Sequence, residues 1–522
     1  MAKEKAEKSI ESVLWSSTNK IRGSVEPSEY KHVILSLIFL KYANDKFEEQ
    51  KQKLIDNGDE AFIEYPDFYA QDNVFFVPEH SRWSYIMENA KQEDIAIKID
   101  TALHEIEISN PTLAGALPDN YYSRLQLDKG VLGSLLDKFN DVSLTSYTDK
   151  DIFGRIYEFC LSKFAIAEGK GKGEYYTPKS VVELLCALIE PYSGIVYDGA
   201  CGSGGMFVQT SKFIEEHKGD KLGISVYGQE YTATTRKLAM MNLAIRGISA
   251  NFGDRAASTF QNDLHPDLKV DYALMNPPFN QKQWREENEL IDDARWNGYT
   301  IPPTSNANYA WILNMISKLS NNGCGCLLLA NGALSAGGVE YQIRKQLIEN
   351  DLVEAIFVLP MNMFYSTDIS VTIWLFNKNK KARKVKKNGK TIEYRDRTNE
   401  ILFVDLREKG HPFEKKYVAF NEDDIKEIAT TYHNWISKDK DTLYKDVKSY
   451  CKGVTIDTVK KQDYSLVVSK YIEFNRKENA IDFDVEMKKI HTELSKLLIE
   501  ENTSKAKVLK VMEGLGYGIK LS

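Results

Sequence analysis

From Tyr192 onward, short β-branched segments alternate with amphipathic segments of helical length, and no other feature constrains the fold as strongly. Apolar residues recur at helical spacing over 233–246, 309–319 and 339–349. Seven strands are expected between them, over residues 194–198, 224–230, 250–253, 270–276, 325–330, 353–359 and 370–377. The alternation predicts an α/β fold with a mostly parallel, seven-stranded sheet and helices on both faces. Ligands of such sheets bind at the carboxyl ends of the strands, where we expect the chemistry.

The chain before residue 190 lacks this alternation and is expected to be helical. Ser28 can cap a helix whose apolar residues follow at helical spacing, namely Tyr30, Val33, Ile34, Leu37 and Ile38. Further helices are expected before Asn110 and over residues 125–139 and 150–167. We therefore divide the chain into three parts: a helical N-terminal domain (residues 1–148), an α/β domain (residues 149–475) and a helical C-terminal tail (residues 476–522).

The tail carries a regular apolar pattern. Five residues recur at alternating spacings of four and three, namely Phe483, Met487, Ile490, Leu494 and Leu497. Such a pattern is typical of a seam for helix–helix contact. The pattern leaves open whether the seam meets the chain's own N-terminal domain or another subunit, although so short a seam more often packs within its own protein.

Composition excludes several function classes. The 522 residues include 68 Lys and Arg against 75 Asp and Glu, a net charge of −7 that argues against binding nucleic acid through bulk charge but allows a local basic groove. The six cysteines show neither a disulfide framework nor a zinc spacing, so no metal site is expected. No signal-peptide pattern is present, and the best apolar run, residues 33–40, is too short to cross a bilayer. These features predict a soluble cytoplasmic protein without membrane contact.

One segment is strongly basic: residues 378–390 contain eight Lys or Arg and an Asn388-Gly389 turn signal. A solvated hairpin loop and a contact with the DNA backbone both explain such a run, and we favour the hairpin loop.

Asp198 ends the first expected strand and leads into a glycine-rich turn that opens a helix. The turn contains Ala200, Gly202, Ser203, Gly204 and Gly205. Glycines let the backbone approach a ligand closely, and a helix N-terminus offers unpaired N–H groups. The dinucleotide fingerprint G-x-G-x-x-G is not matched, because Phe207 occupies the third glycine position, and the chain has no phosphate-binding G-x-x-x-x-G-K-[ST]. NAD and ATP are therefore disfavoured as ligands.

The next two expected strands also end in acidic residues. Glu230 can accept both hydroxyl protons of a ribose, and Asp254 can accept a hydrogen bond from an adenine amino group. Either residue alone could be a helix cap or a solvated turn residue. Three successive acidic strand ends favour an adenosine-bearing ligand.

The decisive motif is Asn276-Pro277-Pro278-Phe279, which ends the strand over residues 270–276. The prolines break the strand and leave carbonyl groups without ladder partners. The Asn276 side-chain carbonyl and the Pro277 backbone carbonyl can accept both hydrogens of a planar exocyclic amine, which makes its nitrogen more nucleophilic. Phe279 offers a flat face on which a flipped base can stack.

At these residues the chain resembles the modification (M) subunit of type I restriction-modification systems, a family of S-adenosylmethionine-dependent N6-adenine DNA methyltransferases. Residues 198–205 match the family's cofactor motif D-P-A-C-G-[ST]-[AG]-G, and residues 276–279 match its N-P-P-F catalytic motif. Residues 173–179, 305–311 and 359–365 also resemble the family, and the resemblance spans about residues 5 to 500. The order of the two motifs is that of the γ class of amino-methyltransferases.

The resemblance implies a Rossmann-like methyltransferase fold with S-adenosylmethionine as cofactor. The methionine moiety would be lined by Glu174, Tyr175, Tyr176, Thr177, Pro178, Lys179, Ser203, Gly204 and Gly205. Asp198 would lie at the amino-acid portion, Glu230 on the ribose and Asp254 near the cofactor adenine. Asn276 and Pro277 would hold the N6 atom of the target adenine, while Phe279 would stack on its ring.

By the same resemblance, the helical domain would contact double-stranded DNA and a partner, and the C-terminal helices would dock on a separate specificity (S) subunit. Two M chains would share one S chain, which supplies the sequence specificity, and a restriction (R) motor-nuclease subunit can join them. Gly199 and Ser370 stand where the family usually has proline. The glycine would loosen the turn, but neither departure removes a reacting group.

Two alternatives remain open. A methyltransferase of this fold could act on another planar amine, such as an RNA base or a protein glutamine, although the helical domain and the C-terminal seam fit a multi-subunit DNA enzyme better. The chain could also be a catalytically silent scaffold, against which the intact Asp198, Glu230 and Asn276 argue.

Overall fold

The structure is a computed structural model that describes residues 27–125, 127–141, 152–168, 176–220, 223–414, 416–439, 444–474 and 483–518. The chain divides into two compact units, Met1–Ile472 and Glu473–Ser522, and each is described by itself. No helix within the described ranges is both long enough and apolar enough to span a membrane.

The N-terminal part of the first unit is helical, as predicted. It contains α2 (Pro27–Asp56), α3 (Asp67–Ala70), α4 (Trp83–Glu88), α5 (Ile95–Ser109), α6 (Tyr121–Leu125) and α7 (Lys129–Asn140). The predicted apolar face of α2 is buried, because Val33, Ile34, Leu37 and Ile38 are at most 1% exposed. The side chains of Ser28 and Tyr30 lie outside the described residues.

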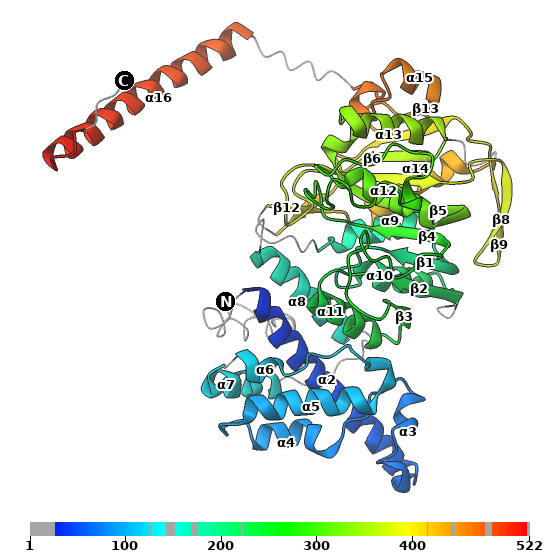
Figure 1. Cartoon of the computed structure of the whole chain (residues 1–522), viewed down its shortest axis with the longest axis vertical. Helices are drawn as coiled ribbons and strands as arrows, with labels where there is room; N and C mark the ends of the chain where they lie inside the picture. Colours follow the sequence, from blue (N-terminus) through cyan, green and yellow to red (C-terminus); the bar gives the residue numbers. More distant parts are fainter. Residues whose placement is uncertain are drawn as a thin grey trace, which may run out of the picture. The chain divides into compact units, whose positions relative to one another are not determined.

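The core of these helices continues into the α/β part of the chain. It includes Tyr157 of α8 (Ile152–Glu168) together with Leu238 and Met241 of α11 (Ala233–Ala244). In Figure 1, α8 and α11 lie between the blue N-terminal helices and the sheet. The N-terminal helices are therefore anchored next to strands β1 to β3 by burial of apolar side chains.

The sheet has nine strands in the order β13-β10-β6-β7-β5-β4-β1-β2-β3. The seven predicted strands are present: β1 (Gly194–Asp198), β2 (Ile224–Gly228), β3 (Ala250–Asn251), β4 (Val270–Met275), β5 (Leu319–Ala330), β6 (Val353–Val358) and β7 (Val371–Asn377). The prediction of a seven-stranded sheet was wrong in number, because β10 (Glu400–Asp405) adds to β6 in parallel and β13 (Cys451–Thr455) adds to β10 in antiparallel. β7 also runs antiparallel, and the remaining pairs are parallel.

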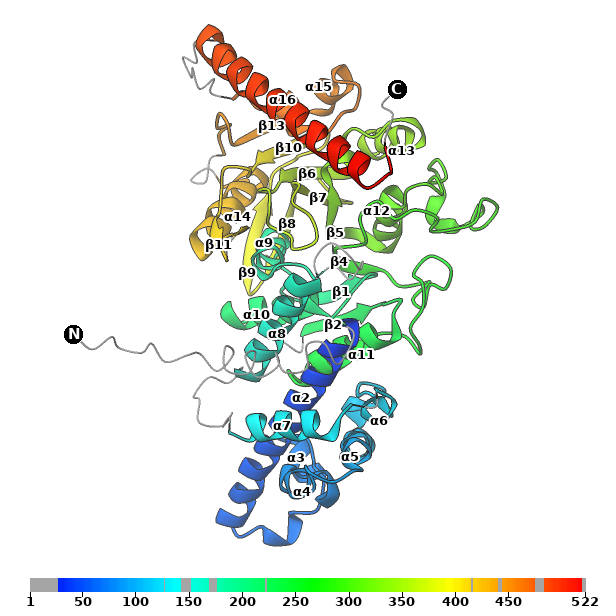
Figure 2. The same ribbon diagram turned by 90° about the vertical axis from the view of Figure 1, so that its left-hand side faces the viewer.

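Helices cover both faces of the sheet, as the alternation predicts. One face packs against α9 (Lys179–Ile189), α10 (Gly205–Glu216) and α14 (Glu422–Ile436). The other packs against α12 (Asn308–Lys318), α13 (Gly338–Glu349) and α15 (Ile456–Lys461). Figure 2 shows α9, α10 and α14 on one side of the strands and α12 and α13 on the other. Neighbouring residues of a strand enter different cores, with Val196 facing α10 and Tyr197 facing α12.

The basic segment over residues 378–390 takes part in a hairpin, as favoured, but it is not a solvated loop throughout. Its residues 383–387 form β8 (Arg383–Lys387), which pairs with β9 (Lys390–Tyr394) across the Asn388-Gly389 turn. Both turn residues have positive φ, 45° and 73°, as tight hairpin turns require. Lys380 is only 3% exposed and forms an ion pair with Asp351, so part of the positive charge serves the packing of the chain itself. A second hairpin joins β11 (His411–Phe413) and β12 (Tyr417–Ala419).

The second unit contains α16 (Phe483–Gly514). The predicted seam lies on this helix with Met487, Ile490, Leu494 and Leu497 between 46% and 55% exposed. The side chain of Phe483 lies outside the described residues.

Candidate active site

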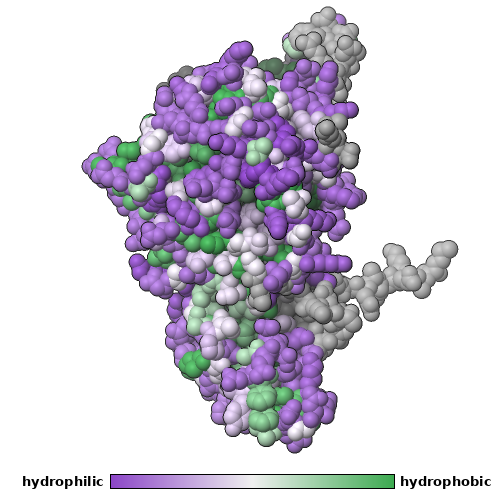
Figure 3. Space-filling model, turned by 90° about the vertical axis from the view of Figure 1, so that its right-hand side faces the viewer, coloured by the Kyte–Doolittle hydropathy of each residue, from purple (hydrophilic) through white to green (hydrophobic). Residues whose placement is uncertain are grey.

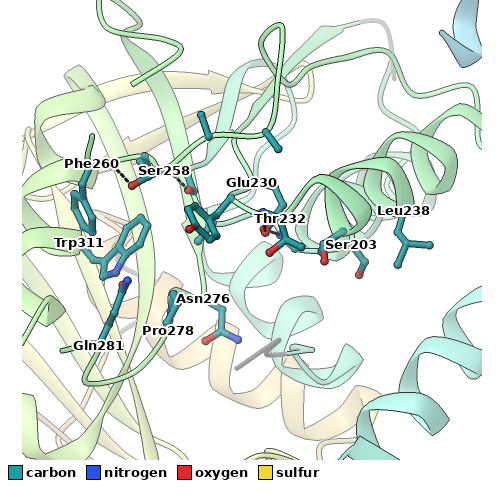
Figure 4. Close-up of a pocket in the computed structure, with 18 of the residues that line it drawn as sticks. Ser203, Glu230, Thr232, Leu238, Ser258, Phe260, Asn276, Pro278, Gln281 and Trp311 are labelled. Carbon is teal, nitrogen blue, oxygen red and sulfur yellow. Dashed lines mark hydrogen bonds between the residues drawn. The ribbon is translucent and has the colours of Figure 1, made fainter. Parts of the chain in front are cut away.

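A cavity of about 730 Å³ lies at the carboxyl ends of β1, β2 and β4, where the α/β fold predicts a ligand site. Figure 4 shows Ser203 and Leu238 at one end of this cavity, Gln281 and Trp311 at the other, and Glu230 between them. Of the predicted site residues, the cavity is lined by Tyr176, Ala200, Gly202, Ser203, Glu230, Asn276 and Pro278. The volume is typical of small-molecule sites.

The glycine-rich turn opens onto the cavity. Gly202 has a φ of 54°, and a Cβ atom placed there would meet no heavy atom within 4 Å. The Gly202 backbone N–H donates to Glu230 Oε2 at 3.1 Å, while the other carboxylate oxygen of Glu230 accepts from the Thr232 N–H at 2.9 Å. The turn and the β2 end therefore hold each other in place and leave free space beside a fixed carboxylate.

The other two predicted acids do not line the cavity. Asp198 is 1% exposed, and its Oδ1 accepts a hydrogen bond from the Ala200 N–H at 2.9 Å. Asp254 has a side chain that is 71% exposed and paired with Arg255 at 3.0 Å. The residues that follow, from Arg255 to Asn262, line the cavity in its place.

Asn276 directly follows β4 and is 6% exposed, and its side-chain amide is hydrogen-bonded through its nitrogen atom only. Its Nδ2 donates to Thr177 Oγ1 at 2.8 Å, whereas its Oδ1 is buried without a hydrogen-bond partner. A buried carbonyl oxygen without a donor costs free energy, and a ligand N–H group in the cavity would recover it. Phe279 is half-buried against Phe364, with 6.0 Å between ring centroids, and does not line the cavity.

The residues predicted before and at the start of α9 (residues 174–179) do not all line the cavity. Tyr176 lines the cavity, and Pro178 precedes the first residue of α9. Lys179 is 47% exposed and lies 3.6 Å from Glu183. Glu174 and Tyr175 lie outside the described residues.

Comparison with known proteins identifies the family. A model of the N-6 DNA methylases matches residues 148–480, and a model of the HsdM N-terminal domain matches residues 10–139. The methylase subunit of the type I restriction enzyme HindI from Haemophilus influenzae is 38% identical over an alignment of 464 positions, which covers 84% of this chain and 100% of that protein. The chain belongs to the methylase subunits of type I restriction enzymes. It is thus an S-adenosylmethionine-dependent N6-adenine DNA methyltransferase.

Further relatives agree with this membership. The methylase subunit of MjaIX from Methanocaldococcus jannaschii is 33% identical over an alignment of 527 positions, which covers 97% of this chain and 92% of that protein. The fold is similar to that of a type I methyltransferase subunit from Streptococcus thermophilus, with a TM-score of 0.71 at 20% identity over 89% of this chain and 99% of the other. A modification subunit from Vibrio vulnificus gives a TM-score of 0.58 at 18% identity, covering 86% and 92%.

Several lining residues of this methylase subunit were not predicted. Phe260 and Trp311 contact each other with 4.4 Å between ring centroids, and the Trp311 Nε1 and Gln281 Oε1 atoms are buried without hydrogen-bond partners. Lys31 reaches the same cavity from α2. Trp311 belongs to the segment 305–311 that resembles the family, so that signal could have pointed to it, whereas no motif marks Lys31 or Phe260.

The hydrogen bond from Asn276 to Thr177 predicts a positioning role for the threonine. Thr177→Val keeps the shape but removes the acceptor, so the Asn276 amide loses its orientation. One hydrogen bond is worth about 1 kcal/mol, and we expect kcat for DNA methylation to fall about fivefold. Thr177→Ser should retain most of the activity. Single-turnover methylation rates, with cofactor affinity measured separately, check this, and equal rates for the valine variant and the wild type would contradict it.

Burial raises the pKa of Asp198 to about 8, with a smaller contribution from the charge of Glu230. Since this value lies above the 3.8 of an ordinary Asp, the stabilisation from the protonated carboxyl is complete below pH 4 and is lost as the pH rises through about 8. Between these values, the free energy of unfolding should fall by about 1.4 kcal/mol per pH unit more steeply for the wild type than for Asp198→Asn. Urea unfolding of both proteins between pH 6 and pH 8 measures how the free energy of unfolding depends on pH. Equal slopes for the two proteins would contradict the prediction, because they would show that Asp198 does not titrate in this range.

Gly199 does more than loosen the turn, which is all we expected of it. A Cβ atom there would lie 2.5 Å from the hydroxyl oxygen of Tyr197, which is fully buried beneath it. Gly199→Ala should therefore destabilise the fold by about 1–3 kcal/mol, and adding Tyr197→Phe should recover part of the loss. Thermal unfolding checks this against Gly205→Ala, where a Cβ meets nothing within 4 Å. Equal destabilisation by Gly199→Ala and Gly205→Ala would contradict this, because it would show that the Tyr197 side chain can move away from the new Cβ atom at no cost in free energy.

Proposed function

We propose that Asn276 and Pro277 carry the catalytic step by accepting both N6 hydrogens of a target adenine that has left the DNA duplex. The observation that carries this proposal is the Asn276 Oδ1 atom, which is buried, unpartnered and placed at the cavity by the bond to Thr177. The Pro277 carbonyl oxygen likewise accepts no hydrogen bond from any described residue. Two fixed acceptors align the amine and draw its lone pair out of conjugation with the ring.

S-adenosylmethionine fits the remainder of the cavity and supplies an electrophilic methyl group on a sulfonium. Glu230 presents a carboxylate on which the ribose hydroxyls can donate, and the open backbone at Gly202 and Ser203 admits the methionine portion. Residues placed as here would hold N6 in line with that methyl group, so that the new N–C bond would form as the S–C bond breaks and leaves a neutral thioether, and the N6 proton would go to water. No strong general base is required of the chain, so its contribution is alignment and activation of the amine.

The wall formed by Phe260 and Trp311 offers aromatic surface for an extruded base, together with the Trp311 N–H donor. Phe279, which the motif assigns to stacking, packs against Phe364 in this structure, and we assign it the support of the loop that carries Asn276.

The family membership supports a multi-subunit assembly. We infer that the chain acts on double-stranded DNA with a specificity (S) subunit, two M chains to one S chain, and that a restriction (R) subunit can join. The exposed apolar seam of α16 is the surface we assign to the S subunit. We also place the protein in the cytoplasm, where the bacterial and archaeal cells that hold its relatives keep their DNA.

Transfer of labelled methyl groups tests the substrate class. The chain should label duplex DNA in the presence of an S subunit and should label DNA weakly without it, since its net charge of −7 provides little affinity for DNA. RNA and a protein fraction containing glutamine should remain unlabelled. Label on RNA or protein but not on DNA would refute the proposed function.

A further inference from the structure

The β8–β9 hairpin covers a second cavity, of about 530 Å³, at the end of the sheet opposite the catalytic loop. Its lining includes Gly194 and Asp271 at the beginnings of β1 and β4 and Asn377 at the end of the antiparallel β7. Asn276 follows the other end of β4, so the length of the strand separates the two cavities. Figure 3 views the molecule from the side on which Figure 1 draws the hairpin, and hydrophilic residues dominate the upper part of that face.

The lining of this second cavity is strongly cationic. Five cations and one carboxylate contribute to it, namely Arg383, Lys384, Lys386, Lys387, Arg397 and Asp271. Three of the cations have carboxylate partners, in the pairs Lys384–Glu393, Lys387–Glu190 and Arg397–Glu354 at 2.6, 3.3 and 2.6 Å. The Asp271 carboxylate accepts from the Ile195 N–H at 2.9 Å. Arg383, which faces inward, forms no ion pair with a described residue, so its positive charge at the cavity has no carboxylate partner there.

Among the cations that line this cavity, Arg383 has the least compensated positive charge. It is partly buried beneath the hairpin, and its side chain donates to the Asn379 backbone carbonyl. Its guanidinium lies 5.3 Å from the centroid of the Tyr394 ring, and the Arg397 guanidinium lies 5.4 Å from the same centroid. Burial, and next the charge of Arg397, lower the pKa of Arg383, which means that its charged form is poorly compensated.

Three tyrosines add neutral donors. Tyr272, Tyr394 and Tyr432 all line the cavity, and no hydrogen bond occupies their hydroxyl groups within the described part of the chain. Burial raises the pKa of Tyr272 and of Tyr432, so both keep their protons. A guanidinium and several hydroxyl donors around one space match the oxygen atoms of a phosphate group.

We propose that this cavity binds a phosphorylated small molecule of about mononucleotide size, with Arg383 as its main anion contact. The volume is in the range of small-molecule sites. The backbone of a DNA duplex fits this cavity less well. Side chains along β8 alternate in exposure, so that Arg383, Val385 and Lys387 face inward while Lys384 and Lys386 face solvent.

Calorimetric titration of the full chain with pyrophosphate and with adenosine monophosphate tests the proposal. Saturating S-adenosylmethionine keeps the nucleotide out of the first cavity. Both probes present phosphate oxygens. Tighter binding of pyrophosphate would identify an inorganic ligand, and tighter binding of adenosine monophosphate would identify a nucleotide. Loss of charged hydrogen bonds should weaken binding at least about tenfold in Arg383→Gln. Lys390→Gln removes one charge from the same hairpin outside the cavity and should leave affinity unchanged.

Tyr272→Phe provides an independent variant if Arg383→Gln unfolds, and it should weaken binding without removing a charge. Failure of the wild type to bind either probe would overturn the proposal, as would equal weakening in Arg383→Gln and Lys390→Gln, which indicates general surface charge. Arg383→Gln that weakens binding of duplex DNA but not of the phosphate probes would instead assign this face to DNA.

Discussion

Replacing Asn276 with alanine is expected to lower the DNA methylation rate at least about 100-fold and to leave S-adenosylmethionine binding nearly unchanged. The substitution removes an acceptor oxygen that is buried at the cavity without a hydrogen-bond partner among the described residues. Losing a fixed group that stabilises charge as it develops costs a factor of about 10² to 10³ in kcat. Cofactor affinity should persist, because the Glu230 carboxylate and the Gly202 turn remain in place.

Single-turnover methylation with the assembled complex measures this effect, and calorimetry measures the cofactor affinity. Asn297→Ala serves as the matched control, since Asn297 is exposed and does not line the cavity. A normal methylation rate for Asn276→Ala would show that the assigned catalytic role is wrong. Equal loss of activity and of cofactor binding would indicate a collapsed site and would also contradict the account.

The second large effect is expected at α16. The double substitution of Leu494→Lys and Leu497→Lys should weaken assembly with the S subunit at least about 100-fold, because burial of one leucine contributes about 1.5–3 kcal/mol. Both side chains are more than half exposed, at 53% and 55%, so the substitutions should not disturb the helix itself. DNA methylation should be lost with assembly, whereas S-adenosylmethionine binding should remain.

The control for α16 places two lysines on the opposite face of the same helix. Thr492 and Thr503 lie roughly 160–180° around the helix axis from the seam at 100° per residue. Both are exposed, and each hydroxyl donates only to the carbonyl four residues earlier. Thr492→Lys with Thr503→Lys should assemble normally in sedimentation experiments. Normal assembly of the leucine double variant would assign the S-subunit contact to another surface.

The fold was predictable wherever the pattern was local. β-branched runs and helical spacing predicted all seven strands from β1 to β7, because each is bounded by its own turn signals. The strands β10 and β13 were missed, since β10 pairs with β6 and β13 pairs with β10, each across more than 40 residues of intervening chain, and neither follows the strand–helix alternation. The hairpin turn of the basic run was predicted, whereas the burial of Lys380 was missed for a similar reason, since its ion pair with Asp351 is a tertiary contact.

The candidate site, like the fold, was predictable only where its residues are neighbours in the chain. Motifs of a few adjacent residues located the Gly202 turn and Asn276, because their chemistry is carried by neighbours in the chain. The bond between Asn276 and Thr177 spans 99 residues, and the contact of Phe260 with Trp311 joins the loop after β3 to the helix α12. No sequence pattern encodes such contacts, nor the position of the Asp254 side chain at the surface.

Identification of the methylated nucleoside tests the central claim most directly. DNA treated with the assembled complex and labelled S-adenosylmethionine is digested to nucleosides, and the label is located by chromatography and mass spectrometry. We predict that the label is in N6-methyladenine and that it disappears with Asn276→Ala. Label in a methylated cytosine, or N6-methyladenine formed equally well by the alanine variant, would contradict the account.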